Sequence, residues 1–360
     1  MPRPRIAVLL PDLRPGGVER MRLRLAAAWI DHGLDVDIVL RRRDGALLAE
    51  VPPAARVVDL AAPRLRRIVL PLARYLRARR PDALLAAMWP LTALAPLAAR
   101  LAGYRGRVVV SEHAPLSRQP HAGALLRASA RWGYRRADAV VAVSAGVADD
   151  LAALTGLPRE AFAVIHNPAA VAPQAAPARS GPSPLVLAVG TLKRVKRFDL
   201  LIEAFARIAG DDEARLCILG EGEERARLEA LVARHGLGDR VSLPGYVADT
   251  APWYAAADLF VLASDHEGFG NVIVEALAQG TPVVSTDCPV GPREILDGGR
   301  HGRLVPPGDA GALAQAMRES LRAPHDAGAL RARARDFAVD AIGERYLELL
   351  LPGRRGAAPA

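Results

Sequence analysis

The stretch SDHEGFGNVIVEALAQG, residues 264–280, is the part of the sequence around which the rest of the chain is organised. It follows an apolar run, residues 259–262, that is short enough to be a buried strand. A glycine-rich loop then leads into a helix that begins near Gly270 or Asn271. Such a loop presents backbone N–H groups at the positive end of a helix dipole, which suits a phosphate group. The stretch therefore predicts an anion-binding unit of strand, loop and helix.

Two carboxylates accompany this loop. Glu267 lies within it, and Glu275 follows Asn271 by one helical turn, so that Asn271 and Glu275 face the same side of the helix. The neighbours of Glu275 are apolar, and a carboxylate in such company is more often hydrogen-bonded to a hydroxyl or a cation than unpaired. A ligand-binding pair fits this pattern, and so does a Glu in the first turn combined with a surface Glu.

The composition indicates a globular protein of two domains. A length of 360 residues is long for a single core, and 51% hydrophobic with 24% charged residues argues against disorder. The two cysteines, Cys217 and Cys288, lack a metal-ligand spacing and fit a reduced cytosolic setting. The first 13 residues have too short an apolar run and no cleavage-site pattern, so no signal peptide is expected.

Residues 83–99 carry no charge and need a separate interpretation. Pro90 and Pro96 interrupt the run, and its length is at the short end for a membrane span. The pattern favours a buried strand over residues 83–88, a turn, and then a buried helix. A transmembrane helix is the alternative.

The charge is distributed unevenly. Residues 1–175 contain 26 arginines and no lysine against 14 acidic residues, whereas the remainder contains 22 basic and 25 acidic residues. A half with a net charge of +12 should attract an anionic partner such as a membrane surface, a phosphate-bearing lipid or a nucleic acid. A solvated arginine-rich surface is the alternative. The only lysines, Lys193 and Lys196, fall in one loop and are weak evidence for a site there.

The first half alternates strands and helices. Residues 6–10 predict a strand, residues 15–17 a glycine turn, the next segment an amphipathic helix and residues 36–40 a second strand, which is a βαβ unit. The turn lacks the GxGxxG spacing of a dinucleotide site. Asp35 and Asp37 alternate with apolar residues in a strand, so a metal role is not expected.

Three further segments complete the first half. Residues 64–80 predict a basic helix, bent at Pro71, that either lies on an anionic bilayer or is an ordinary surface helix. Residues 108–110 predict a strand, and His113 follows its end, where ligands meet open α/β sheets. Residues 139–143 predict a strand that ends at Ser144.

The segment 169–184 is rich in proline and alanine without periodicity, which predicts a linker. Beyond it the alternation restarts, with both lysines in the loop 190–197 and helices over 198–209 and from 223. The predicted strands span residues 185–189, 216–219, 241–243, 259–262 and 283–286. Two doubly wound sheets with ligand-binding strand ends are therefore expected.

Taken together, these motifs resemble the retaining glycosyltransferases of family 4. Each motif alone is common, but their order and spacing over nearly the whole chain are specific. The motifs are residues 16–20 (GGVER), 137–140 (ADAV) leading to Ser144, 165–168 (IHNP), Lys196 before 198–201 (FDLL), 220–222 (GEG), 244–246 (PGY), the glutamates Glu267 and Glu275, and 288–296 (CPVGPREIL). The last segment resembles a subset that acts on lipid-linked oligosaccharides and surface polysaccharides.

The resemblance implies the GT-B fold, which is an α/β fold of two facing Rossmann-like, doubly wound domains with a cleft between them. The expected organisation is an acceptor-side domain over residues 1–168, the linker over 169–184 and a donor-binding domain over 185–335. A helix over 336–351 is expected to pack back toward the first domain.

The resemblance also implies an activity. A hexose or N-acetylhexosamine would move from a nucleoside diphosphate sugar, with a UDP-sugar favoured, to a lipid-linked glycan or lipopolysaccharide-type acceptor. The anomeric configuration would be retained and neither a metal nor another cofactor would be needed. The protein would work in the cytoplasm, peripherally at the inner face of the membrane.

Residue roles follow from the same resemblance. Lys196, Glu267 and His113 are the expected catalytic residues, with Lys196 directed at the leaving phosphate. The donor would be bound by Gly16, Gly17, Arg194, Lys196, Tyr246, Val247, Glu267, Phe269, Gly270, Asn271, Val272 and Glu275, with Glu275 on the ribose. Many relatives carry an arginine directly after the glycine at position 190. This chain has Thr191 there, so that Lys193 or Arg194 would have to supply the charge.

Two other classes of function fit parts of the sequence. A relative with the same fold that hydrolyses, epimerises or phosphorolyses sugars would share the motifs. A non-catalytic nucleic-acid-binding or membrane-binding protein would explain the basic half, but aromatic residues make up only 4% of the chain and no known nucleic-acid-binding motif is present, so no nucleic-acid partner is expected.

Overall fold

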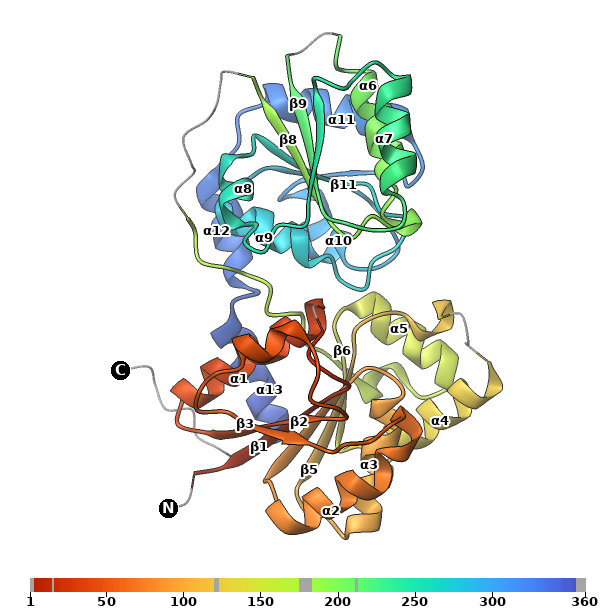
Figure 1. Cartoon of the computed structure of the whole chain (residues 1–360), viewed down its shortest axis with the longest axis vertical. Coiled ribbons are helices and arrows are strands. Elements are labelled where there is room, and N and C mark those ends of the chain that lie inside the picture. Colours follow the sequence, from red (N-terminus) through yellow and green to blue (C-terminus); the bar gives the residue numbers. More distant parts are fainter. Residues whose placement is uncertain (1–2, 15, 120–122, 175–182, 211–212, 354–360) are drawn as a thin grey trace. The chain divides into compact units, whose positions relative to one another are not determined.

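A computed structural model describes residues 3–14, 16–119, 123–174, 183–210 and 213–353 (Figure 1). The chain forms two compact units. Unit 1 contains the chain up to Pro168 and again from Val339 onward, and unit 2 contains Ala169–Ala338. Of the predicted linker, residues 169–174 have no helix or strand, and residues 175–182 lie outside the described part of the chain.

Unit 1 is built on a seven-stranded parallel sheet with the order β3-β2-β1-β4-β5-β6-β7. Its central strands β1, β4 and β5 are buried over nearly their whole length and mostly apolar because helices cover both faces, as is typical of doubly wound sheets. The strands are β1 (Arg5–Leu10), β2 (Asp35–Leu40), β3 (Arg56–Asp59), β4 (Ala83–Ala87), β5 (Arg107–Glu112), β6 (Ala139–Ala142) and β7 (Phe162–Val164).

Helices α1 and α13 pack against one another and share a core with one face of this sheet. Trp29 of α1 meets Tyr346 of α13 edge to face at 6.5 Å, and its Nε1 donates a hydrogen bond to the Gly343 carbonyl at 3.3 Å. On the other face, α3 packs against β4 and β5 and lies between α2 and α4. The helices are α1 (Gly17–Asp31), α2 (Val69–Arg79), α3 (Leu91–Ala102), α4 (Ala124–Tyr134), α5 (Ala145–Thr155) and α13 (Val339–Leu350), with short 3-10 turns at Ala46–Glu50, Leu65–Arg67, Leu116–Arg118 and Arg159–Ala161.

Unit 2 repeats the design with a six-stranded parallel sheet of order β10-β9-β8-β11-β12-β13. Helices α6, α7 and α11 share a core with one face of the sheet, and α9 contacts both α8 and α12. The elements are β8 (Leu185–Val189), α6 (Phe198–Ala206), β9 (Arg215–Leu219), α7 (Arg225–Arg234), β10 (Val241–Gly245), α8 (Ala251–Ala256), β11 (Leu259–Leu262), α9 (Asn271–Gln279), β12 (Val283–Thr286), α10 (Pro292–Ile295), β13 (Arg303–Val305), α11 (Ala310–Arg322) and α12 (Ala327–Arg335), with 3-10 turns at Arg194–Lys196 and Asp297–Gly299.

The prediction of one helix over residues 64–80, bent at Pro71, was wrong. A 3-10 turn over Leu65–Arg67 precedes α2, which begins only at Val69. Pro71 therefore lies in the first turn of α2, where a missing N–H breaks no helical hydrogen bond. The helix over 198–209 is also shorter than predicted and ends at Ala206.

The uncharged run after residue 82 is the predicted strand, turn and helix, namely β4 and α3. Within the described residues, none of the helices combines the length and apolarity that crossing a bilayer requires.

Candidate functional site

The predicted donor-binding residues of unit 2 come together because the sheet is parallel. The loops that follow β8, β9, β10, β11 and β12 all leave the sheet at its carboxyl edge, where ligands bind in open α/β sheets. Lys196 comes from the first of these loops, Tyr246 and Val247 from the third, and Glu267 from the fourth.

Two glycines let these loops approach one another closely. Gly220 has φ +144°, and a Cβ at this position would lie 1.9 Å from the carbonyl oxygen of Gly190. Gly291 has φ +95°, and its Cβ would lie 1.8 Å from the carbonyl oxygen of Phe269. Any larger residue would push the loops apart, so the glycines fix the backbone around the predicted phosphate-binding turn.

Lys196 and Glu267 form the centre of the site. Lys196 Nζ lies 2.6 Å from Glu267 Oε1, and the same oxygen accepts a hydrogen bond from Ser264 Oγ at 2.7 Å. Ser264 is itself fixed because its carbonyl accepts from Thr286 Oγ1 at 2.7 Å. The side chains of Lys196 and Glu267 retain 22% and 11% exposure, so the pair is held in place yet open to a ligand.

A second ion pair ties the same two loops together. Arg197 Nη1 donates to Asp265 Oδ1 at 3.0 Å, and the Asp265 N–H donates to the Val195 carbonyl at 2.9 Å. Cys288 is buried beside the pair. Burial and the negative charge of Glu267 raise the pKa of its thiol to about 12, so Cys288 is protonated at neutral pH.

Glu275 is held by a residue that sequence reasoning missed. The hydroxyl of Tyr254, on α8, donates to Glu275 Oε2 at 3.0 Å, and Tyr254 is fully buried against Phe260. Burial and the charge of Glu275 raise the pKa of Tyr254 well above its ordinary value, so it remains a hydrogen-bond donor. Helix packing alone brings the two together, and no local pattern in the sequence indicates it.

The helix α9 begins at Asn271, as predicted, with Gly270 as a left-handed N-cap at φ +102°. Phe269 is buried and packs edge to face on Phe337 at 5.6 Å, which anchors the loop before the helix. Asn271 and Val272 are half-buried in the first turn. Of the remaining predicted residues, Val247 is half-buried, whereas Tyr246 and Arg194 are exposed, as is Thr191.

Gly16, Gly17 and His113 belong to unit 1 and lie at the carboxyl edge of its sheet. Gly16 is the N-cap of α1, and a Cβ there would lie 2.2 Å from Glu19 Oε2. Gly17 is the first, exposed residue of α1, and Pro15 lies outside the described residues. His113 directly follows β5 and is half-buried.

His113 belongs to a polar cluster around Arg22, which the sequence analysis did not single out. Arg22 is 1% exposed, and its Nη2 lies 2.5 Å from Ser111 Oγ, 3.1 Å from His113 Nε2 and 3.2 Å from the Tyr346 hydroxyl. Because a guanidinium only donates, the Nε2 of His113 acts as an acceptor. Burial and the charge of Arg22 lower the pKa of His113 well below its ordinary value, while a hydrogen bond with Asn167 acts in the opposite direction.

Replacing Arg22 by methionine should raise the pKa of His113 toward its ordinary value, because one of the two causes of the shift is removed. The return should be partial, since burial remains the larger cause. The imidazole proton shifts followed by NMR across pH 4–8 measure this. Arg24→Met on the same helix serves as the control, and an unchanged titration in Arg22→Met would contradict the assignment.

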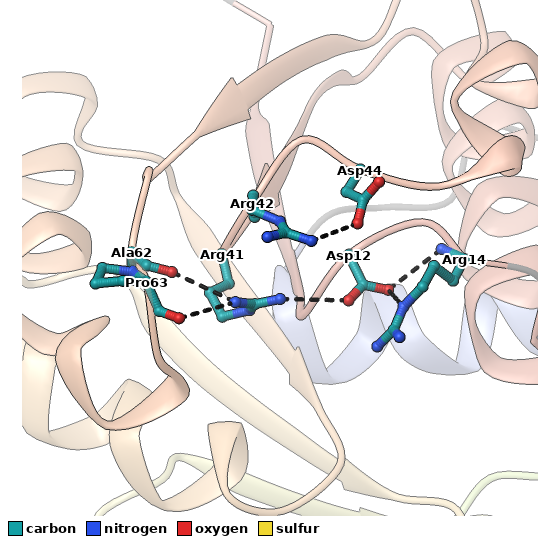
Figure 2. A network of polar contacts seen from close by, with 7 residues as sticks. All are labelled: Asp12, Arg14, Arg41, Arg42, Asp44, Ala62 and Pro63. Carbon is teal, nitrogen blue, oxygen red and sulfur yellow. Dashed lines mark hydrogen bonds and ion pairs between the residues drawn. The ribbon is translucent and has the colours of Figure 1, made fainter.

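A network of charges joins the segments that follow β1 and β2 in unit 1 (Figure 2). Asp12, just after β1, accepts from Arg14 Nε at 3.0 Å and pairs with Arg41 Nη2 at 3.5 Å. Burial alone would raise the pKa of Asp12, but the hydrogen bonds and charges of the two arginines outweigh it and lower the pKa. Arg41 Nη1 also donates to the carbonyls of Ala62 and Pro63, each at 3.5 Å, so the network holds the chain that leads to α2.

Glu112 is a buried carboxyl at the end of β5, next to His113. It is 1% exposed and accepts from Thr92 Oγ1 at 2.5 Å, the Tyr134 hydroxyl at 2.8 Å and the Trp89 N–H at 3.1 Å. Burial raises the pKa of Glu112 to about 7, although these three hydrogen bonds act against the shift.

The raised pKa of Glu112 predicts a pH-dependent stability. Between about pH 5 and 7 the folded state keeps a proton that the unfolded state has already lost, so the free energy of unfolding should fall as the pH rises, by on the order of 1 kcal/mol per pH unit. Glu112→Gln should lack this slope, whereas the exposed Glu160→Gln should retain it. Urea unfolding at several pH values measures the difference, and equal slopes in all three proteins would refute the prediction.

Comparison with known proteins agrees with the two-unit architecture. The model of the family "Glycosyltransferase Family 4" matches residues 15–172, and that of "Glycosyl transferases group 1" matches residues 183–323. The chain is 34% identical to the lipopolysaccharide core biosynthesis glycosyltransferase LpsE of Rhizobium meliloti, over 94% of this chain and 96% of that protein. It is 32% identical to the lipopolysaccharide 1,6-galactosyltransferase of Salmonella typhimurium over about half of each chain, 48% and 49%.

Among solved structures, that of Anabaena HepE in complex with UDP-glucose superposes with a TM-score of 0.79. The superposition covers 96% of this chain and 99% of HepE at 23% sequence identity, which is evidence for the fold. Two Rossmann-like units with these matches define a glycosyltransferase with the GT-B fold. The chain belongs to glycosyltransferase family 4.

Proposed function

We propose that the protein transfers a hexose or N-acetylhexosamine from a UDP-sugar to a lipid-linked glycan or lipopolysaccharide-type acceptor, with retention of the anomeric configuration. The Lys196–Glu267 pair carries this proposal. A cation held 2.6 Å from a carboxylate of the loop that leads into α9 matches a donor whose leaving group is a phosphate and whose transferred group is a polyhydroxylated sugar.

The proposed role of Lys196 is to stabilise the leaving group. When the anomeric C–O bond breaks, negative charge develops on the β-phosphate, and the ammonium group together with the backbone N–H groups of residues 269–272 is directed at it. Positive charges and hydrogen-bond donors that are already in position typically contribute several kcal/mol of transition-state stabilisation. Glu267 then contacts the hydroxyl groups of the transferred sugar. Arg194 supplies a further positive charge to the diphosphate of the donor.

The remaining residues are assigned to binding. Glu275, oriented by Tyr254, accepts hydrogen bonds from the ribose hydroxyls. The backbone near Tyr246 and Val247 meets the base. In unit 1, Gly16 and Gly17 approach the phosphates, and His113 lines the sugar and acceptor side. A neutral His113, consistent with its lowered pKa, is suited to hydrogen-bonding hydroxyl groups.

The reaction proposed is a front-side substitution without a metal ion, in which the leaving phosphate oxygen helps to remove the acceptor proton. The protonated thiol of Cys288 is a poor nucleophile, which agrees with a mechanism that has no covalent intermediate. A UDP-sugar is favoured because the structural neighbour HepE was solved with UDP-glucose. The acceptor class is favoured because LpsE and the Salmonella galactosyltransferase are named for lipopolysaccharide synthesis. The location that we propose is the cytoplasmic face of the membrane.

A screen of nucleotide sugars by thermal shift, followed by transfer assays, tests this function. One UDP-sugar should raise the melting temperature, because a ligand that binds only the folded state stabilises it. That donor should then label a glycolipid in membrane extracts in the presence of EDTA, and NMR of the product should show the retained configuration.

Three outcomes would contradict the proposal. If none of the nucleotide sugars stabilises the protein, the donor site is wrongly assigned. If free sugar is released without an acceptor at the rate of transfer, the protein is a hydrolase with the same fold. If the configuration is inverted, the front-side mechanism is wrong.

A further inference from the structure

Unit 1 contains an apolar groove that the proposed reaction does not use. Its volume is about 460 Å³, and it lies where the turn Leu65–Arg67, the start of α3 and the start of α4 meet. We call it the Trp89 groove. The residues that line it are Arg64, Leu65, Arg66, Trp89, Pro90, Ala93, Leu94, Leu125 and Ser129.

The walls of the Trp89 groove are formed before any ligand arrives. The Trp89 N–H donates to buried Glu112 at 3.1 Å, and Trp89 Nε1 donates to Ser129 Oγ at 3.1 Å. Ser129 in turn donates to the Leu126 carbonyl at 3.0 Å. The hydroxyl of Ser129 is therefore already engaged, and the interior of the groove offers apolar surface to a ligand.

The rim of the groove is cationic. Arg64 and Arg66 are exposed, and neither makes an ion pair with an acidic side chain in the described part of the chain. The carbonyls of Ala62 and Pro63, directly before Arg64, are held by Arg41 (Figure 2). The two rim arginines thus extend from an anchored segment.

The surrounding surface has the same character. Helices α2, α3 and α4 carry six arginines and no acidic residue. Leu70 and Leu125 are 67% and 80% exposed on this surface, although large apolar side chains are normally buried. One of these arginines, Arg79, pairs with Asp37 at 3.6 Å, so the helices still carry an excess of positive charge. Exposed leucines among arginines in such excess are the combination that anionic bilayers bind, through burial in the interface and attraction to the headgroups.

We propose that this face docks on an anionic phospholipid bilayer, and that the Trp89 groove takes up a hydrocarbon chain of a lipid whose phosphate pairs with Arg64 and Arg66. The volume is within the range of pockets for small molecules. The inference rests on the proposed membrane location and deepens it by naming the surface and the ligand.

Sedimentation with vesicles of phosphatidylglycerol and phosphatidylcholine tests the docking. Wild-type protein should bind vesicles rich in phosphatidylglycerol and lose affinity as salt rises, because salt screens the charges. Arg64→Ala/Arg66→Ala should weaken partitioning roughly 10-fold or more, whereas Arg234→Ala/Arg335→Ala, which removes two exposed arginines of unit 2, should not. Leu125→Ser, which removes the most exposed leucine of this face, should weaken it about 10-fold.

Fluorescence tests the groove itself, since Trp89 lines it. Vesicles of phosphatidylglycerol with brominated acyl chains should quench part of the tryptophan emission. This part should disappear in Trp89→Phe, while quenching should persist in Trp253→Phe, which lies in unit 2. Vesicle binding without any quenching that depends on Trp89 would overturn chain uptake. Absence of vesicle binding, or equal binding by all variants, would overturn the docking surface.

These measurements need no sugar donor, so they separate this inference from the proposed function. If the protein transfers sugar but does not bind anionic vesicles, only the proposed lipid-binding surface is refuted. If the protein binds vesicles through the Trp89 groove but neither binds a nucleotide sugar nor transfers its sugar, only the proposed glycosyltransferase reaction is refuted. Specific binding of an acidic protein in place of vesicles would also refute the lipid assignment.

Discussion

Replacing Lys196 by alanine is expected to lower the turnover number about 100- to 1,000-fold, because a preorganised charge directed at the leaving phosphate is lost. The Michaelis constant for the donor should change much less, since the charge on the β-phosphate grows mainly in the transition state. Steady-state kinetics with the donor found by thermal shift measure both constants.

The fold should survive this change, because Glu267 keeps its hydrogen bond from Ser264 and the loop keeps the Arg197–Asp265 pair. Arg215→Ala is the matched control. It removes one exposed positive charge at the first residue of β9, and therefore at the amino ends of the strands, away from the carboxyl ends where the candidate site lies. Turnover by Lys196→Ala at the wild-type rate would remove the leaving-group role.

Replacing Glu275 by alanine should weaken binding of UDP about 10- to 100-fold, because hydrogen bonds between a carboxylate and the ribose hydroxyls are lost. Turnover at saturating donor should fall less than in Lys196→Ala. Isothermal titration calorimetry with UDP measures the effect directly.

Tyr254→Phe separates binding from orientation. It keeps the carboxylate but removes the hydrogen bond that orients it, so a smaller loss of UDP affinity is expected. Glu213→Ala, an exposed position just before β9, controls for the loss of a negative charge. Unchanged UDP affinity in Glu275→Ala would exclude the ribose role.

Most of the central strands could be predicted from the sequence because they are buried on both faces. Strands β8 and β11 lie where their apolar runs predict, since a parallel sheet under two layers of helices favours apolar residues on both faces. Strand β12 also has the predicted bounds, although its last two residues, Ser285 and Thr286, are buried polar residues. The strands that were missed are β3, β7 and β13, and each is a short edge strand. An edge strand is half-exposed, so its composition differs little from that of a loop.

For the candidate site, sequence could predict the local geometry only where one motif contains the residues. Glu267, Glu275 and the start of α9 lie within 17 residues, and local pattern was enough to place them. Tyr254 and Ser264 act through packing between elements that no motif links. Arg22 did have a signal, because positions 18, 22, 25 and 29 follow one helical face, and an arginine at such a position is inward-facing.

Helix α13 follows unit 2 in the sequence but packs in unit 1, which limits the fragments of the chain that can fold alone. A fragment cut at residue 168 would lack α13, which would uncover Trp29 and Leu25 and remove the carbonyl that accepts from the indole N–H. Such a fragment should be poorly soluble, whereas the contiguous second unit should tolerate excision. Recombinant work on the amino-terminal half alone therefore needs the last helix fused back, for example by circular permutation.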